Sequence, residues 1–570
     1  MSRFILLLLL SGIWASVALG QSAYIPYSTE YYHLIDRYEI KGGHNALGYQ
    51  STVKPYQRKD VIQLIDSVRI DKQADLSDID KFNIQYLKND SWEWGNSTTG
   101  NSVKPFLKPF YEKKSDLYSL QNKDIDLHIN PVFYGLVGYG KDVPDNTFIN
   151  TRGIEIRGAI GKKLAFYTYV TDTQLRLAGY FQERIRKFSA VPGEGAWKIF
   201  HPNAAYTVED NSATDFFTAR GYITFKPIKQ IGLQFGQDKV FIGNGYRSMI
   251  LSDNSGPMLF LKITTNIGRV QYVNLFSEIM NWQADIAAYG DLPPKKFLAF
   301  HHLGINIGDN FNVGVFESIV HSRDKSQGYF DFNYMNPVIF YRAIEAQKYS
   351  ADNSLLGADF KWNFCRQFQV YGQLLLDEFN LQKLREGNGW WGNKIGTQLG
   401  AKYIDAFNIN NLDIQAEVNL ARPYTYEHIS DLTNYVSYNQ SLAHPLGANF
   451  QELIGRVYYQ PIPRLNLMGM CVVANYGLDS DDGVNYGSNP LLSYDARPAN
   501  QEYGYYIGQG INTNLAYTEF SAAYQLRHNL FIDFRQIFRR QNSTASIYNR
   551  STGFSLLSIR LNIAQRQMAF

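Results

Sequence analysis

Residues 412–421 read LDIQAEVNLA and alternate between apolar and polar side chains. Because successive side chains of a β-strand point to opposite faces, this stretch has one apolar and one polar face. The apolar face consists of Leu412, Ile414, Ala416, Val418 and Leu420. The polar face consists of Asp413, Gln415, Glu417 and Asn419. Such an acidic, continuous face is unusual for a protein core, and we expect it to line the lumen of a membrane-spanning barrel while the apolar face meets lipid.

The same alternation recurs near the end of the chain. Residues 558–564 alternate large apolar side chains with polar or small ones, and the last residue is Phe570. A terminal aromatic residue resembles the signal by which outer-membrane barrels are recognised for assembly. We predict that this segment is the last strand of the barrel.

The beginning of the chain predicts export. Arg3 precedes an apolar run, and small residues occupy the positions before Gln21, so residues 1–20 are expected to be a signal peptide. No cysteine follows the expected cut, which argues against a lipoprotein anchor. No later run approaches the roughly 20 apolar residues that a membrane-spanning helix needs.

Composition is consistent with a barrel and excludes one class of partner. Aromatic residues make up 15% of the chain, with 41 Tyr and 36 Phe, a profile that interfacial aromatic girdles would produce. Composition alone also fits a large soluble β-sandwich. The net charge of +3 and the lack of long basic runs argue against nucleic acid as a partner. Cys365 and Cys471 could form a disulfide in an oxidising compartment or remain two isolated residues.

The hydrophobic period changes along the chain and divides it in two. Residues 21–116 contain three short amphipathic segments with helical spacing, one from about Tyr27, one opening at Pro55, and one after a Ser77–Asp80 capping box. We expect a small periplasmic helical bundle packed against or inside the barrel mouth. Residues 117–570 alternate with period two in about 18 segments, joined by short turns and long connections. The predicted fold is thus all-β: a transmembrane antiparallel outer-membrane β-barrel with long loops outside.

No catalytic signature is present. The chain lacks a nucleophile elbow, a zinc-protease helix, a phosphate loop and a paired-cysteine motif. His301 and His302 are neighbours on a predicted strand, so their rings should face opposite sides. We therefore expect no enzyme activity, no metal site and no cofactor.

Polar and aromatic clusters provide the candidate binding residues. Aromatic faces beside amides, acids and arginines are able to bind sugars, by stacking and by hydrogen bonds to hydroxyl or uronate groups. The candidates are Tyr246, Arg247, Asn336, Arg342, Glu345, Trp390, Trp391, Glu417, Arg422 and Tyr426. The alternative for the two tryptophans is an interface girdle or a clasp between loops. The alternative for Arg247, Arg342 and Glu345 is a ladder of opposite charges that stiffens the lumen.

Several of these clusters resemble segments of the Wzi-type capsule-assembly family. The segments are residues 243–254 (GNGYRSMILSDN), Asn336-Pro337 with Arg342, Glu345 and Asp352-Asn353, and residues 371–379 (YGQLLLDEF). Residues 422–428 (RPYTYEH) and 444–450 (HPLGANF) are similar to motifs of the branch from gliding bacteria, whose members are often labelled RemB-like gliding-motility proteins. The order and spacing of these motifs extend from about Tyr24 over most of the chain.

The resemblance implies an outer-membrane barrel with a periplasmic helical bundle that retains capsular polysaccharide on the cell without exporting it. The expected partners are surface polysaccharide, outer-membrane lipid and other surface or motility proteins. Two alternatives stay open, a gliding or adhesion component and an outer-membrane channel.

Overall fold

The computed structural model describes residues 22–570 with short gaps. The gaps are residues 28, 47, 72, 97, 162, 196–197, 201–212, 282–293, 324–328, 338–339, 349, 351 and 481–482. The predicted signal peptide, residues 1–20, lies outside the described residues. Within them, no helix is both long and apolar enough to cross a membrane.

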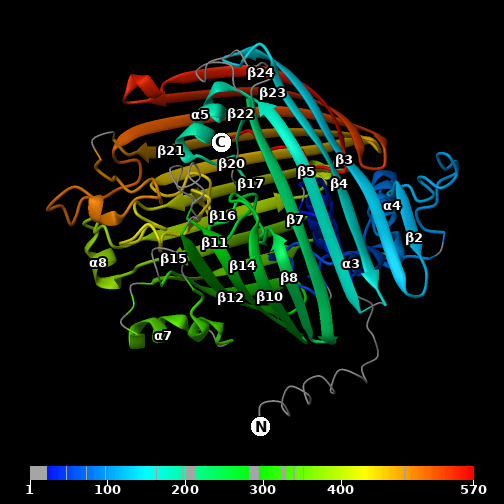
Figure 1. Ribbon diagram of the computed structural model, residues 1–570, viewed down its shortest axis with the longest axis horizontal. Coiled ribbons are helices and arrows are strands. Elements are labelled where there is room, and N and C mark those ends of the chain that lie inside the picture. Colours follow the sequence, from blue (N-terminus) through cyan, green and yellow to red (C-terminus); the bar gives the residue numbers. More distant parts are fainter. Residues whose placement is uncertain are drawn as a thin grey trace, which may run out of the picture.

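The described part of the chain forms a closed antiparallel barrel of 18 strands (Figure 1). The first and last barrel strands pair, with Val137 opposite Leu557, and this pairing closes the wall. The predicted barrel is therefore confirmed. Its strands are β3 (Ile125–Lys141), β4 (Thr147–Ile160), β5 (Leu164–Arg176), β7 (Ala213–Ile228), β8 (Ile231–Asp238), β10 (Met258–Ile267), β11 (Val270–Met280), β12 (Lys295–Ile307), β13 (Phe311–His321), β14 (Asn353–Phe364), β15 (Phe368–Leu376), β16 (Ile395–Tyr403), β17 (Leu412–Ala421), β20 (Phe450–Ile462), β21 (Leu465–Leu478), β22 (Ile511–Arg527), β23 (Leu530–Ser543) and β24 (Arg550–Leu561).

Short strands add to this wall or lie beside it. The strand β2 (Tyr118–Gln121) pairs with the start of β3, and β6 (Lys198–Phe200) pairs with β7. Two further two-stranded sheets are separate from the wall. One joins β1 (Val53–Lys54) to β9 (Phe241–Ile242), and the other joins β18 (Val436–Ser437) to β19 (Gln440–Ser441).

The two ends of the barrel differ in the length of their connections. At one end, tight turns such as 268–269, 308–310 and 528–529 join neighbouring strands, and we call this the short-turn end. At the other, the long-loop end, the long connections predicted from the sequence are confirmed. Figure 1 shows α7 (Tyr341–Lys348) and α8 (Leu381–Glu386) toward the long-loop end, and α3 and α4 toward the opposite end. In outer-membrane barrels the long loops face the exterior.

The predicted helices form a small bundle at the short-turn end. They are α2 (Thr29–Gly42), α3 (Arg58–Ile70) and α4 (Asp78–Asp90). The capping box is confirmed, because the Ser77 side chain accepts from the Asp80 N–H and the Asp80 side chain accepts from the Ser77 N–H. The prediction that Pro55 opens the second helix is wrong, since Gln57 in extended conformation is its N-cap. We call residues 22–116 the plug.

The strand register agrees with the sequence pattern. Glu417 is 1% exposed on the lumen side of β17, whereas its neighbour Val418 is 41% exposed on the outer wall. The prediction that His301 and His302 face opposite sides is also confirmed, because His302 Nε2 lies 2.7 Å from lumenal Asp359 and His301 meets Tyr272 on the outside. Cys365 and Cys471 are both free and exposed, so they form no disulfide with each other.

The prediction for the end of the chain is wrong in one respect. The last strand stops at Leu561, and Phe570 does not end it. Asn562 takes a left-handed backbone (φ 54°), and residues 562–570, which we call the tail, turn into the lumen. There Arg535 Nη1 donates to the Arg566 carbonyl at 3.0 Å, and Gln565 reaches Ser521. The polar side chains of the tail thus have partners inside the barrel, which an extended strand would not give them.

A buried ion-pair cluster fastens the plug to the barrel. Arg37 of α2 pairs with Asp80 of α4 at 3.1 Å, with Asp405 in the β16–β17 turn at 2.5 Å, and with Asp413 on β17. Lys41 bridges Asp80 and Asp405 at 2.9 and 2.7 Å. Because removing one member of a buried ion pair leaves the others unpaired away from water, such a cluster is costly to break. It ties two plug helices to one wall strand.

Replacing Arg37 by Ala should weaken the docking of the plug by about 3–5 kcal/mol, since Asp80 and Asp405 would share the one charge of Lys41 and Asp413 would keep only His33 as a partner. We expect the plug of the purified Arg37→Ala protein to be cleaved faster by trypsin, and the protein to conduct ions in planar bilayers. Lys81→Ala removes only an exposed pair with Asp78 and should behave as the parent protein. An Arg37→Ala protein as resistant and as closed as the parent would contradict the role of the cluster.

The same ion-pair cluster predicts that the plug binds the barrel less tightly at low pH. Burial alone would raise the pKa of Asp80, but Arg37 and Lys41 outweigh it and lower this pKa to about 2 from 3.8. The stabilisation is therefore complete above pH 3.8 and is lost as the pH falls toward 2. Bilayer conductance should begin to rise below about pH 4. In Asp80→Asn this pH step should be smaller, since Asp80 is one of the three carboxylates that pair with Arg37, and a step of the same size in that variant would rule out Asp80 as a source.

Candidate functional site

Among the described residues, the plug, the loop of residues 239–257 and the tail enter the lumen, and parts of the segments 177–191 and 435–443 pack against lumen-facing residues. We call residues 239–257 the inner loop. Plug side chains contact lumen-facing residues around much of the wall. These contacts are Gln50 to the Gly304 carbonyl on β12 at 2.9 Å, Glu39 to Lys361 on β14 at 2.7 Å, Asp36 to Lys402 on β16 at 2.7 Å, Glu30 to Arg560 on β24 at 2.7 Å and Glu93 to Arg157 on β4 at 2.5 Å.

Glu417 holds the inner loop inside the barrel. Its carboxylate accepts the Tyr246 N–H at 2.7 Å, the Arg247 N–H at 3.0 Å and the Tyr371 hydroxyl at 2.8 Å. A Cβ at Gly245 would lie 2.3 Å from a Glu417 carboxylate oxygen, so a larger residue would displace this carboxylate from the loop N–H groups that it accepts. The glycine thus lets the loop backbone approach the wall.

Arg247 links the inner loop to the wall and to the tail. Its guanidinium lies between the rings of Tyr246 and Phe570, at 4.7 and 5.0 Å from their centroids. Its Nη2 is 3.6 Å from Glu452 on β20, and Nη1 donates to Gln567 at 3.4 Å. Because Arg247 is buried and contacts these groups, it connects the inner loop, the wall and the tail inside the barrel.

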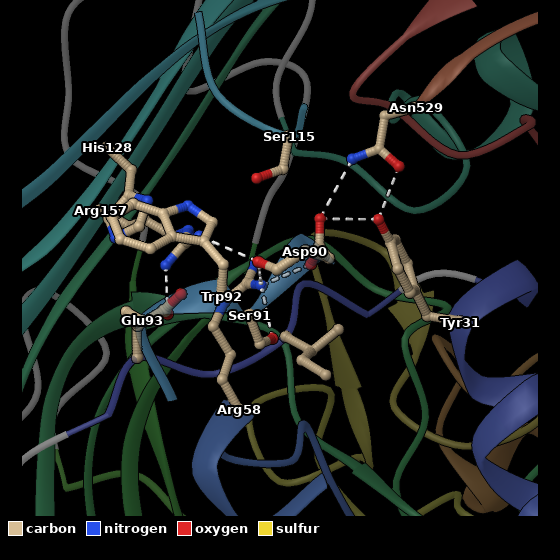
Figure 2. Close-up of polar contacts among 12 residues, drawn as sticks. Tyr31, Arg58, Asp90, Ser91, Trp92, Glu93, Ser115, His128, Arg157 and Asn529 are labelled. Carbon is tan, nitrogen blue, oxygen red and sulfur yellow. Dashed lines mark hydrogen bonds and ion pairs between the residues drawn. The ribbon is translucent and has the colours of Figure 1, made fainter. Parts of the chain in front are cut away.

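A cavity of about 280 Å³ remains between the plug, the inner loop, the tail and the wall of β3, β4, β5 and β7, and residues 184, 192–194, 443 and 445 also line it. Figure 2 shows polar residues at its plug side. Asp90 accepts from the Tyr31 hydroxyl at 2.8 Å and from Asn529 at 3.2 Å, and it pairs with Arg58. Burial would raise the pKa of Asp90, but Arg58 holds it well below the usual range. Arg157 donates to the Asp90 carbonyl at 3.0 Å.

The charged groups drawn in Figure 2 are largely engaged with each other. The Trp92 indole donates to Asp116 at 2.5 Å, and His128 Nδ1 lies 3.0 Å from the same carboxylate. Within the described residues, no group of three or more His, Cys, Asp or Glu is arranged to hold a metal ion. This network attaches the plug to β3 and β4.

A second cluster, which we call the outer aromatic cluster, lies at the long-loop end. It combines Trp390 and Trp391 from loop 377–394, Tyr424 from loop 422–449, and Tyr494, Arg497, Glu502 and Tyr505 from loop 479–510. The Arg497 guanidinium is 4.2 Å from the Trp391 ring, and the Tyr494 ring is 5.0 Å from it. The Trp391 indole donates to Glu502 at 2.8 Å. Rings from three loops thus gather beside the Arg497–Glu502 pair. Trp390, Trp391 and Tyr494 are half-buried, and Tyr424 and Tyr505 are buried.

Two other predicted residues, Arg422 and Tyr426, lie next to this cluster. Arg422 Nη2 donates to the Trp390 carbonyl at 3.1 Å. Tyr426 is fully buried, with its hydroxyl donating to the Met249 carbonyl of the inner loop at 2.8 Å. Its backbone N–H donates at 2.8 Å to Asp377, whose pKa is raised to about 7 by burial. Arg422 therefore borders the cluster, and Tyr426 connects it to the inner loop.

The remaining predicted residues lie elsewhere. Asn336, Arg342 and Glu345 belong to the β13–β14 connection, where Arg342 is exposed and pairs with Glu345 at 3.4 Å. The predicted charge ladder is thus wrong, because Arg247 is deep in the lumen and the other two are on an outside loop.

Sequence reasoning missed Tyr494, Arg497, Glu502 and Tyr505. The aromatic-rich stretches of loop 479–510 were the available signal, but nothing in a linear sequence showed that this loop meets Trp391.

Comparison with solved structures gives the fold its context. The structure is similar to that of Wzi, an outer-membrane protein involved in group 1 capsule assembly in Escherichia coli that is described as a carbohydrate-binding β-barrel. The TM-score is 0.55 and the sequence identity is 13%, and the match covers 95% of this chain and 100% of Wzi. The chain has an outer-membrane barrel fold. OprD of Pseudomonas aeruginosa matches at TM-score 0.40 and 12% identity, over 77% of this chain and 94% of OprD. No protein-family model and no curated protein matches the sequence.

Trp391 should clasp the outer loops together. Removing its indole in Trp391→Ala deletes a hydrogen bond and a cation–π contact, worth about 1–2 kcal/mol together. We expect protease cleavage within loop 479–510 to become about 5- to 30-fold faster in the folded protein. Tyr506→Ala, a change at an exposed ring in the same loop, is the matched control. Equal cleavage in both variants would contradict the clasp.

Proposed function

We propose that this protein is a non-enzymatic outer-membrane barrel that holds surface polysaccharide on the outside of the cell through the outer aromatic cluster. The observation that carries the proposal is the gathering of Trp390, Trp391 and Tyr494 with Arg497 and Glu502 at the long-loop end, above a filled lumen. Aromatic faces stack on the C–H faces of sugars, while arginine and carboxylate groups bond to hydroxyl or uronate groups.

The filled lumen supports an anchor over a channel. Plug, inner loop and tail all contact lumen-facing side chains, and the cavity between them, about 280 Å³, is small for a polymer. The Wzi structure, described as a carbohydrate-binding barrel, lends support through its similar fold. Each site would bind weakly, so retention would depend on many barrels holding one long chain.

The sequence leaves two other functions open, and experiments distinguish them from the anchor. A gliding or adhesion component would bind a protein partner through the same loops. A channel would require the plug or the inner loop to leave the lumen.

The decisive measurement compares cell-bound with shed polysaccharide in the parent strain and in a strain lacking this protein. We expect total polysaccharide to be unchanged and the shed fraction to rise. An unchanged distribution would refute the anchor. Loss of surface motility with normal retention would then favour the gliding component, and conductance of the wild-type protein in planar bilayers would favour the channel.

A second measurement tests the site. Purified protein should bind polysaccharide extracted from the parent strain, and the double variant Trp390→Ala, Tyr494→Ala should bind about tenfold more weakly, a change of about 1.4 kcal/mol. Both side chains are at least partly exposed on the outer loops. Ile547→Ala, at an exposed position of the β23–β24 connection, should bind as the parent does. Equal binding by the double variant would remove the outer aromatic cluster from the proposal.

A further inference from the structure

The β13–β14 connection packs on the outside of the barrel wall. We call its described residues, 322–323, 329–337, 340–348, 350 and 352, the outer-wall loop; it contains η2 (Phe332–Met335) and α7. Tyr334 and Tyr341 of this loop are fully buried against Phe276, Ala299 and Ile319 of strands β11, β12 and β13. Figure 1 shows α7 beside the wall rather than over the barrel mouth.

The wall residues under this loop face away from the lumen. On β12, Gly304 touches plug residue Gln50 and His302 bonds to lumenal Asp359, so even-numbered residues point inward. Ala299 and His301 therefore point outward. Near the short-turn end, Ile305 and Ile307 of the same outward row are exposed.

A polar row interrupts the outer wall beneath the loop. In the strand register, Asn274 on β11 pairs with His301 on β12, which pairs with Glu317 on β13. The row is six residues from Ile307 along β12, which corresponds to about 20 Å along the strand. Because barrel strands tilt by about 40° from the barrel axis, this is about 15 Å along the axis. The apolar band of such barrels is about 25 Å tall. This row therefore falls within the height of the band, where charged side chains facing lipid are destabilising.

The outer-wall loop supplies hydrogen-bond partners to two members of this row, Glu317 and His301. The Glu317 carboxylate accepts the backbone N–H groups of Phe340, Tyr341 and Arg342, the last at 2.9 Å, at the start of α7. The Tyr341 hydroxyl bonds to His301 Nε2, and the Tyr272 hydroxyl lies 3.0 Å from His301 Nδ1. At the two ends of the loop, Arg323 forms an ion pair with Asp331 at 3.1 Å and a second with Asp352 at 2.6 Å. These contacts attach the loop to the wall and remove the polar row from the surface.

The surface that replaces the row is apolar. Phe332 is 79% exposed, Phe340 73% and Tyr329 62%. Beside them, Val315 and Leu356 continue the exposed apolar surface of the wall, and Leu356 pairs directly with Glu317. Because this surface is continuous with the lipid-facing wall, we propose that the outer-wall loop is embedded in the membrane, with Phe332, Phe340 and Tyr329 against the acyl chains of the leaflet at the long-loop end. The inference rests on the barrel fold and is independent of polysaccharide binding.

Lipid-depth labelling tests this placement. In a Cys365→Ser, Cys471→Ser background, Phe332→Cys, Phe340→Cys or Tyr329→Cys is labelled with an environment-sensitive fluorophore. The labelled proteins are reconstituted into dioleoylphosphatidylcholine vesicles with and without nitroxide-labelled lipid. Phe538→Cys, 53% exposed on the outer face of β23, serves as the lipid-facing reference, and Ile547→Cys, 84% exposed in a loop, serves as the water-facing one.

We expect quenching at the three loop positions to match Phe538→Cys and to exceed Ile547→Cys at least threefold. Quenching equal to Ile547→Cys would overturn the proposal. Energy transfer between labelled copies without lipid quenching would overturn it in favour of a second copy of this chain on the patch. All substituted positions are on the surface, and an unchanged resistance of the unheated barrel to detergent denaturation verifies folding of each variant.

Discussion

The constraint on which this structure depends is that every strand of a closed barrel turns half of its side chains into the lumen. In this chain many of those side chains are polar or charged, and burying them without partners would cost several kcal/mol each, while others form two apolar clusters with the inserted segments. The plug, the inner loop and the tail supply the partners. Arg37 with Asp413, Glu39 with Lys361, and Glu417 with the inner-loop backbone all follow from this one requirement. Filling the lumen is how the wall satisfies its own polar face.

The need to pair buried polar groups also explains the polar row of His301 and Glu317 on the outer wall. His301 and Glu317 are polar where the fold calls for apolar side chains, and a loop covers them with its own donors and acceptors. The loop then presents aromatic residues in their place. Polar groups are thus paired on both faces of the barrel, by inserted segments on the inside and by a folded-back loop on the outside.

With the lumen occupied and the wall facing lipid, the surface left for recognition outside the membrane is at the long-loop end. Three loops meet there around Trp391, and the contacts that hold them together also determine which ring faces remain open. The proposed anchor would need no moving part. Its plug could be fastened by buried ion pairs, because the proposed function passes nothing through the barrel.

The sequence by itself predicted the barrel, its approximate number of strands, three helices ahead of it with the Ser77–Asp80 capping box, and the asymmetry of the two ends. These features depend on local periodicity and turn chemistry, which neighbouring residues carry. Only the tertiary structure decided that the tail enters the lumen, that Gly245 lets the inner loop reach Glu417, and that Arg342 and Glu345 lie outside while Arg247 lies within. Pairing between residues such as Trp391 and Glu502 depends on how loops distant in sequence approach one another, and side-chain alternation along a single strand contains no information about that approach.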